Sequence, residues 1–506
     1  MTIELSTELD VVRKSLNGRN GRHERSIIGQ FLTPARIARF MASLFEQEKE
    51  DVRILDAGAG AGSLFAACVE NFVSAKHCPH SIKVVAYEND ERILPYLQDT
   101  MDRCEAISKD AGISFKGEIR PEDFIKSAID QTEEGLFAVQ HERFTHSILN
   151  PPYKKIKGES SSRRLLNAAG MEVSNLYAAF VWLSVRMLEP EGELVAITPR
   201  SFCNGPYFRR FRVKLLEMMS LRHIHVFDSR KKAFGDDDVL QENVIYHAIR
   251  EKSKPERVII SSSDGMDFEK VLKRSVPYEH VVLPGDHDAF IRLLLKDSDE
   301  IVMNRMRCFS TSLSKLGLEV STGRVVDFRA QEYLRALPEE DTVPLIYPCH
   351  FEDGFIHWPA DSGKKPNAII NSPETKELMV EPGYYVLTKR FSSKEERRRV
   401  VAVVYDPNKI KASMIGFENH LNYIHEKGKG LLPNLAKGLA LYLNSSLFDQ
   451  YFRLFSGHTQ VNAADLRKMR YPSWDQLLRL GSYIQHRMPD QEILDEILEK
   501  ECECNG

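Results

Sequence analysis

The sequence predicts an α/β protein: a doubly wound, mostly parallel sheet followed by a mixed α/β domain that ends in a helix. Short apolar runs alternate with helix-like segments over residues 52–250, which is typical of a parallel sheet covered by helices. From about residue 300 the apolar runs shorten, and aromatic and turn residues become frequent. We therefore expect one domain at 1–255, a linker at 256–300 and a second domain at 301–506.

The composition is that of an ordinary globular protein. The 506 residues carry a formal net charge of −4, with 42% hydrophobic and 28% charged residues, which argues against a protein that coats nucleic acid indiscriminately. No apolar stretch approaches the ~20 residues that cross a bilayer, and no signal-peptide pattern opens the chain. The eight cysteines are scattered, which suits a reducing cytoplasm. We expect a cytoplasmic protein with no membrane contact and no metal site.

The first predicted strand, at 52–55, ends in Asp56 and is followed by three alternating glycines, Gly58, Gly60 and Gly62. Glycines allow the backbone to pass close to a ligand, and the helix predicted after them offers free N–H groups. Dinucleotide-binding proteins use a similar turn, so this motif alone leaves the ligand class open.

Two acidic residues follow at later strand ends. The strand predicted at 83–87 ends in Glu88, where a carboxylate would bind two ribose hydroxyls. Asp123 comes after the strand-like residues 113–115 and would accept a hydrogen bond from an adenine amino group. Each carboxylate alone is more often a solvated residue, so the prediction depends on their joint order along the chain.

A rigid turn follows the apolar run 147–149, and it reads Asn150, Pro151, Pro152, Tyr153. The two prolines fix φ and stop a strand or helix, which holds the turn at the edge where open α/β sheets bind ligands. The Asn150 side-chain oxygen and a neighbouring carbonyl would form a pair of acceptors for an exocyclic amino group. Asn-Pro is also a common turn, so the upstream motifs decide between the two interpretations.

The elements after this turn continue the alternation. Residues 175–188 have helical apolar spacing, and strands are predicted at 193–197 and 244–246. Between these strands lies a basic cluster, Arg209–Arg212, which we expect to be a solvated face. The polar, proline-containing residues 250–257 indicate a domain boundary.

In this order the motifs Asp56–Gly62, Glu88, Asp123 and Asn150–Tyr153 resemble those of S-adenosylmethionine-dependent amino-methyltransferases that act on DNA. The segment Gly29–Pro34 precedes them and resembles motif X of that family. Motif X in first place is the order of the gamma class of adenine-N6 enzymes, which are typical of restriction–modification systems. The resemblance implies the class I methyltransferase fold, with a target-recognition domain in the second half of the chain.

The resemblance also implies a mechanism, in which an adenine flips out of double-stranded DNA and its N6 amino group receives the methyl group of S-adenosylmethionine. Asn150, Pro151, Pro152 and Tyr153 would be catalytic. Tyr153 would stack on one face of the base, and Phe234, or failing that Phe227, on the other. The cofactor-binding residues would be Thr33, Pro34, Asp56, Gly58, Gly60, Gly62, Glu88, Asp123 and Asn150.

Polar loops of the second half resemble those of target-recognition domains, which enter the DNA groove. Together with lysines after the catalytic turn, the residues expected to contact DNA are Lys154, Lys155, Lys157, Arg324, Lys389, Arg390, His458 and Gln460. Any one of them is more often structural or phosphate-facing than a reader of bases. We expect double-stranded DNA as the partner and a monomer or weak dimer.

Other functions use the same geometry. A glutamine amide on a protein, or an RNA base, also presents two N–H donors, and an N4-cytosine enzyme more often carries Ser where Asn150 stands. A degenerate, non-catalytic nucleic-acid-binding subunit is a further alternative. The long segment after the catalytic half favours a polymer substrate whose sequence is read.

Overall fold

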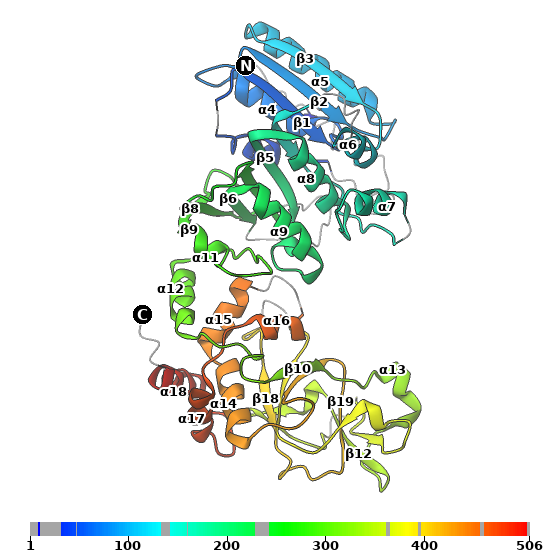
Figure 1. Ribbon diagram of the computed structural model, residues 1–506, viewed down its shortest axis with the longest axis vertical. Helices are drawn as coiled ribbons and strands as arrows, with labels where there is room; N and C mark the ends of the chain where they lie inside the picture. The colour runs from blue at the N-terminus through cyan, green and yellow to red at the C-terminus, as the bar shows by residue number, and fades with distance from the viewer. Residues whose placement is uncertain are drawn as a thin grey trace. The chain divides into compact units, whose positions relative to one another are not determined.

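The computed structural model divides into two compact units, Met1–Leu295 (unit 1) and Lys296–Gly506 (unit 2) (Figure 1). Unit 1 contains one nine-stranded sheet, and unit 2 contains two smaller sheets among the described residues. The structure describes residues 9–10, 32–46, 48–132, 142–158, 160–227, 242–360, 365–392, 396–455 and 460–502.

The sheet of unit 1 has the strand order β3-β2-β1-β4-β5-β7-β6-β8-β9. Its strands are β1 (Asp51–Ala57), β2 (Ser81–Tyr87), β3 (Ser114–Arg120), β4 (Phe144–Leu149), β5 (Leu188–Pro199), β6 (Ser220–Phe227), β7 (Asn243–Ile249), β8 (Arg257–Ser263) and β9 (Leu272–Pro277). Strands β1 to β5 pair in parallel, whereas β7 runs antiparallel to both β5 and β6. The predicted mostly parallel sheet is confirmed, and the carboxyl ends of β1 to β5 lie at one edge.

Helices cover both faces of this sheet. Ile54, Val84, Ile148 and Val195 belong to one buried cluster together with residues of α3, α4 and α5. Successive residues of a strand point to opposite faces of the sheet. The residues next to these four in their strands therefore point to the other face, where α8 contacts both α6 and α9. The bounds are α3 (Ala35–Ala42), α4 (Ser63–Val73), α5 (Leu94–Asp110), α6 (Phe124–Thr132), α7 (Ser161–Ala168), α8 (Leu176–Met187), α9 (Arg209–Met218) and α11 (Tyr278–Val281), with short 3-10 helices η1 (Arg200–Cys203) and η2 (Pro206–Phe208).

The structure differs from the linker predicted at 256–300. Strand β8 pairs in parallel with β6, and β9 pairs antiparallel with β8, so both extend the sheet of unit 1. The two units divide after Leu295. Residues 250–256 form only the connection between β7 and β8, and Arg257 already begins β8, because a proline-containing polar segment suits a tight turn as well as a domain boundary.

Unit 2 is of mixed α/β type, with sheet orders β10-β20-β17-β18-β14-β13 and β11-β15-β12-β19-β16. Its strands are β10 (Glu319–Thr322), β11 (Leu334–Arg335), β12 (Thr342–Ile346), β13 (Phe351–Glu352), β14 (Phe355–Ile356), β15 (Ala368–Ile370), β16 (Met379–Val380), β17 (Tyr385–Lys389), β18 (Ala402–Tyr405), β19 (Ile415–Phe417) and β20 (Leu421–His425). Its helices are α12 (Asp297–Arg305), α13 (Asp327–Ala330), α14 (Pro433–Leu443), α15 (Ser446–Phe455), α16 (Ala463–Lys468), α17 (Trp474–Ser482) and the C-terminal α18 (Gln491–Cys502).

Candidate active site

A cavity of about 280 Å³ lies at the carboxyl edge of the unit 1 sheet. The strands bring distant parts of the sequence to it: Gly58 follows β1, Glu88 follows β2, and Asn150 follows β4. The residues predicted from sequence that line this cavity are Thr33, Gly58, Gly60, Glu88, Asp123, Asn150 and Pro152. The fold therefore gathers motifs that are spread over more than a hundred residues of sequence.

The turn after β1 requires its glycines. Gly58, Gly60 and Gly62 have φ angles of 81°, 57° and 89°, which L-residues with side chains rarely adopt. A Cβ on Gly60 would lie 2.7 Å from Cδ2 of Leu32, and one on Gly62 would lie 2.7 Å from the ring of Phe65. The turn thus brings bare backbone to the cavity, while Gly62 itself stands at the N-cap of α4.

Asp56 lies behind this turn, since it is fully buried and does not line the cavity. Burial raises the pKa of its carboxyl to about 8, the backbone N–H of Phe65 opposes the shift, and the nearby charge of Glu88 adds to it. A carboxyl with such a pKa is mostly protonated at neutral pH, so it can donate as well as accept a hydrogen bond.

Glu88 is oriented by the backbone of two turns. Its Oε2 accepts from the N–H of Gly60 at 2.9 Å, and its Oε1 accepts from the N–H of Asp90 at 2.8 Å. Burial raises the pKa of Glu88, whereas these backbone N–H groups lower it. Each carboxylate oxygen has a further lone pair, so both keep capacity for hydroxyl groups of a ligand in the cavity.

Asp123 has a structural role that the sequence did not indicate. Its Oδ1 accepts from the backbone N–H groups of Ile125 at 2.8 Å and Lys126 at 3.3 Å, in the first turn of α6. A carboxylate at this position also interacts favourably with the helix dipole. The helix start thereby fixes the orientation of Asp123 at the cavity wall.

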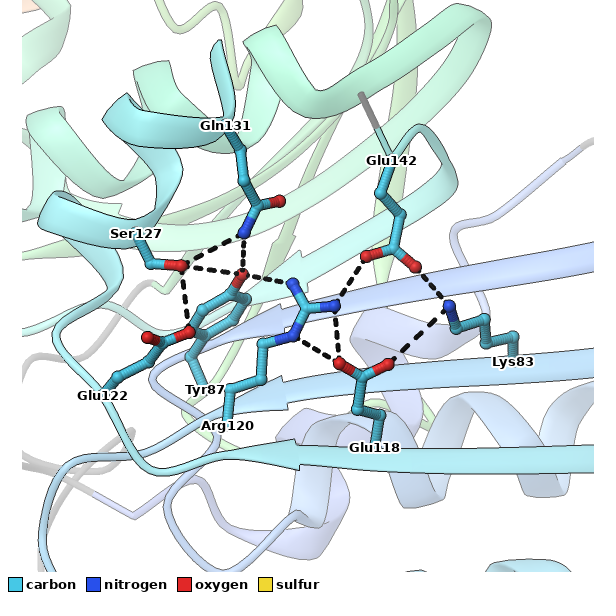
Figure 2. Close-up of polar contacts among 8 residues, drawn as sticks. All are labelled: Lys83, Tyr87, Glu118, Arg120, Glu122, Ser127, Gln131 and Glu142. Carbon is cyan, nitrogen blue, oxygen red and sulfur yellow. Dashed lines mark hydrogen bonds and ion pairs between the residues drawn. The ribbon is translucent and has the colours of Figure 1, made fainter. Parts of the chain in front are cut away.

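A polar network beside the cavity holds β2, β3 and α6 together, with Arg120 at its centre (Figure 2). The Arg120 guanidinium donates to the hydroxyl of Tyr87 at 2.6 Å and to Glu118 at 2.6 Å, and pairs with Glu142 at 2.8 Å. The hydroxyl of Tyr87 also accepts from Gln131 of α6 at 3.0 Å. Because Tyr87 lines the cavity, the network fixes one of its walls.

The Asn150 amide is held from both ends. Its Nδ2 donates to Oγ1 of the buried Thr33 at 3.1 Å, and its Oδ1 accepts from the hydroxyl of Tyr153 at 2.9 Å. Burial raises the pKa of Tyr153 well above its ordinary value, so the hydroxyl remains a donor. The Oδ1 atom that the sequence assigns to the target amine is therefore already held in place by a hydrogen bond within the protein.

Two of the predicted proline residues lie behind the cavity wall, unlike Asn150 and Pro152. Pro151 is buried, Pro34 is buried directly before α3, and neither lines the cavity. Tyr153 does not line the cavity either; its ring meets Tyr177 edge to face, with the ring centroids 6.4 Å apart.

Sequence analysis missed the aromatic wall of the cavity. Phe124 and Phe180 both line it, with ring centroids 5.1 Å apart, and Phe180 lies beside the turn at Gly58. The position of Phe124, directly after Asp123, was an available signal. Phe180 offered none, because its spacing in α8 is that of any buried helix residue.

The expected DNA-contacting lysines of unit 1, Lys154, Lys155 and Lys157, are all exposed directly after the turn at Asn150–Tyr153 that the sequence predicts to be catalytic. A backbone bridge from Lys155 to Asn175, at the start of α8, positions this segment. The lysines are therefore open to a polymeric anion beside the cavity.

In unit 2, four expected DNA contacts gather at one end of the six-stranded sheet. Lys389 ends β17 opposite Leu421, the N–H of Arg390 donates to the carbonyl of His420 at 2.8 Å, and the N–H of Gly323 donates to the carbonyl of Leu421 at 2.9 Å. Gln460 forms an isolated antiparallel β-bridge with Phe391. We call this group the basic edge; it comprises Arg324, Lys389, Arg390, His420 and Gln460. Sequence analysis missed His420, which is half exposed.

Phe234 and His458 lie outside the described residues. Phe227, the second choice for the base-stacking aromatic, is buried at the end of β6 and packs against His225 and Phe268. Its environment is that of a core residue, because both ring partners belong to the same packed layer.

In the part of the chain that the structure describes, no group of three or more His, Cys, Asp or Glu side chains is arranged to hold a metal ion. In the same ranges, no helix combines the length and hydropathy needed to cross a bilayer.

Known proteins resemble this chain over most of its length. The Eco57I restriction-modification methylase family matches residues 80–234. The chain is 41% identical over 498 residues to the type II methyltransferase M.PstI of Providencia stuartii, covering 98% of this chain and 97% of that protein. It is 46% identical over 466 residues to the type II methyltransferase M.BsuBI of Bacillus subtilis, covering 91% of this chain and 90% of that protein. A solved DrdV–DNA complex has a TM-score of 0.44 and 12% identity, covering 94% of this chain and 59% of that one.

Proposed function

This chain belongs to the type II methyltransferases of restriction–modification systems, and we propose that it methylates the N6 amino group of an adenine in double-stranded DNA. Methylation at one recognition sequence would protect host DNA from a nuclease that cuts there. The observation that carries the proposal is the fixed amide of Asn150 at the cavity wall, between Thr33 and Tyr153.

The cavity fits S-adenosylmethionine. The positive-φ turn at Gly58 and Gly60 offers backbone without side chains, Glu88 offers two oriented oxygens for ribose hydroxyls, and Asp123 offers an acceptor for the adenine amino group. The aromatic wall of Phe124 and Phe180 suits a flat base. When bound, this cofactor supplies a methyl carbon made electrophilic by a positively charged sulfur.

Asn150 would prepare the target nitrogen. An exocyclic amine is a poor nucleophile because its lone pair is delocalised into the ring. The Asn150 Oδ1 and the Pro151 carbonyl would accept its two hydrogens and favour a pyramidal nitrogen with a localised lone pair. Holding the two reacting groups in a fixed orientation can lower the activation barrier of the transfer by roughly 7–11 kcal/mol.

Base flipping would present the amine to these acceptors. Extruding a base costs a few kcal/mol, and stacking on an aromatic ring returns about 1–3 kcal/mol. Tyr153 would provide that ring after its hydroxyl leaves Asn150, and Phe234 remains our choice for the opposite face. The exposed lysines after the turn would bind phosphates, and the basic edge of unit 2 would contact the recognition sequence.

Product analysis tests the proposal. The protein is incubated with methyl-labelled S-adenosylmethionine and, in parallel reactions, duplex DNA, RNA or a host protein extract. The nucleic acids are digested to nucleosides and the proteins to amino acids, and the products are separated. We expect label in N6-methyladenine. Label in N4-methylcytosine would refute the adenine assignment, and label only in RNA or in a protein glutamine would refute DNA as the substrate.

A further inference from the structure

Tyr207 has the most exposed large hydrophobic side chain among the described residues, at 82% exposed. It lies in η2, on the connection from β5 to α9. A single exposed aromatic is normal on a protein surface, so exposure alone indicates no site. Three further observations concern the segment that carries it.

The first is that a buried arginine fixes this segment. Sequence analysis expected Arg212 on a solvated face, but its side chain is fully buried, and burial lowers its pKa to about 10. Its Nη1 donates to the carbonyls of Phe202 at 2.8 Å and Gly205 at 2.7 Å, and its Nε donates to the carbonyl of Asp288 at 3.0 Å. Because these bonds link the connection to a distant loop, they hold it in one conformation.

The second is that the same connection contacts the catalytic turn through Tyr177. The buried Tyr177 ring stacks on Phe208, with centroids 5.4 Å apart, and its hydroxyl lies 3.2 Å from Oγ of Ser201. The Tyr177 ring also packs against the Tyr153 ring in a T-shaped contact. Strands β4 and β5 are parallel neighbours, so the turns after them share one edge of the sheet. Tyr207 is thus presented on a segment that packs directly beside the catalytic aromatic.

The third is charge. Arg209 and Arg210 follow Tyr207 in the first turn of α9, which contains no acidic residue. Their side chains are mostly exposed, and they pair with Asp288 at 3.2 Å and with Glu172. Exposed pairs of this kind are worth little, so these arginines can exchange their partners for phosphates at low cost.

We propose that Tyr207 stacks on a base of the target duplex next to the flipped adenine. An aromatic ring held on a preorganised, positively charged segment loses little conformational entropy on binding, and every base offers a face to it. The ring then stabilises the interrupted base stack while the adenine is outside. This inference rests on the proposed function.

The test compares Tyr207→Ala with wild type on two duplexes. One carries the normal base pair at the target adenine, and the other carries a mismatch there, which lowers the cost of flipping. We expect kcat/KM on the matched duplex to fall about 5- to 100-fold, and the mismatch to restore most of the loss. Fluorescence of 2-aminopurine at the target position should show a smaller flipped population in Tyr207→Ala. Tyr207→Phe, which keeps the ring, should behave like wild type.

Leu272→Ala is the matched control, because Leu272 is 71% exposed in unit 1 but lies on β9, outside the cavity and its turns. We expect Leu272→Ala to leave kcat/KM unchanged on the matched and on the mismatched duplex. We expect all variants to have the wild-type affinity for S-adenosylmethionine and the wild-type melting temperature. An unchanged rate in Tyr207→Ala, or an equal loss on both duplexes, would overturn the inference. If wild type methylates neither duplex, the proposed function fails first, and the inference loses its premise.

Discussion

Unit 1 buries two groups of ionisable side chains that differ in what surrounds them. Glu88 lines the cavity, is buried and is oriented by backbone N–H groups, and Asp56 is buried behind the same turn. In the middle of the sheet, Glu193 of β5 lies between His146 and His247, with the Glu193 Oε2 and His247 Nε2 atoms 2.6 Å apart. In the first group Glu88 keeps acceptor capacity towards the cavity, whereas in the second group Glu193 pairs with His247 inside the protein.

The two groups also respond to acid in opposite directions. Burial lowers the pKa of His146 to about 4. As the pH falls from 6.5 towards 4, the unfolded chain binds a proton at His146 that the folded protein excludes, so the folded state loses stability over this range. Burial raises the pKa of Asp56 to about 8, so its ionisation opposes folding increasingly as the pH rises from about 4 to about 8. A shifted pKa alone therefore does not identify a functional site; the cavity beside the group does.

The largest effect on stability is expected from Glu193→Ala. This change removes the buried carboxylate at Nε2 of His247 and leaves the backbone N–H of Glu46 without its acceptor. We expect the free energy of unfolding to fall by about 3–5 kcal/mol in urea titrations at pH 7. Glu172→Ala, which removes an exposed partner of Arg210, should change it by less than about 1 kcal/mol. Equal stabilities of the two variants would contradict the structural role of Glu193.

Asn150→Ala should have the largest effect on catalysis without a comparable effect on stability. We expect methyl transfer to DNA to fall by on the order of 10³-fold, as for other fixed groups that act at the transition state. The Kd for S-adenosylmethionine, measured by calorimetry, should stay within about threefold, because the ribose and adenine contacts assigned to Glu88 and Asp123 remain. Wild-type turnover in this variant would refute the role of Asn150.

A smaller, pH-dependent effect is expected from the histidines. Between pH 6.5 and pH 4, the unfolded chain binds a proton at His146 that the folded protein excludes, which costs about 3 kcal/mol. His146→Gln should show a correspondingly smaller loss of stability over this range in urea titrations. Parallel stability curves for the variant and wild type would show that His146 does not titrate in this way.

An effect of comparable size and opposite pH dependence is expected from Asp56→Asn. Wild type should lose about 1.4 kcal/mol of stability per pH unit from Asp56 as the pH rises between about 4 and 8, because the folded state retains a proton that the unfolded chain releases. The amide does not ionise, so the variant should lack this slope. The difference between the two curves from pH 5 to pH 7.5 measures it, and a constant difference would argue against a protonated Asp56.

Local sequence chemistry was enough to predict the glycine, carboxylate and amide residues through which the strand ends reach the cavity. The glycines after β1, the acidic residue after β2 and the prolines after Asn150 each act within a few residues of a strand end, where backbone geometry is set locally. A parallel sheet then brings those strand ends to one edge, so their order predicted a common site.

Tertiary structure alone decided the features that depend on distant partners. Arg212 reads as a surface charge until its carbonyl partners at Phe202, Gly205 and Asp288 are known, and Phe180 reads as helix core until the turn at Gly58 lies beside it. The basic edge likewise forms from four separate segments of unit 2. The sequence by itself determined which groups stand at each strand end, because that is local backbone chemistry. Which of them meet, and which charges are buried, was decided by long-range packing that no short pattern encodes.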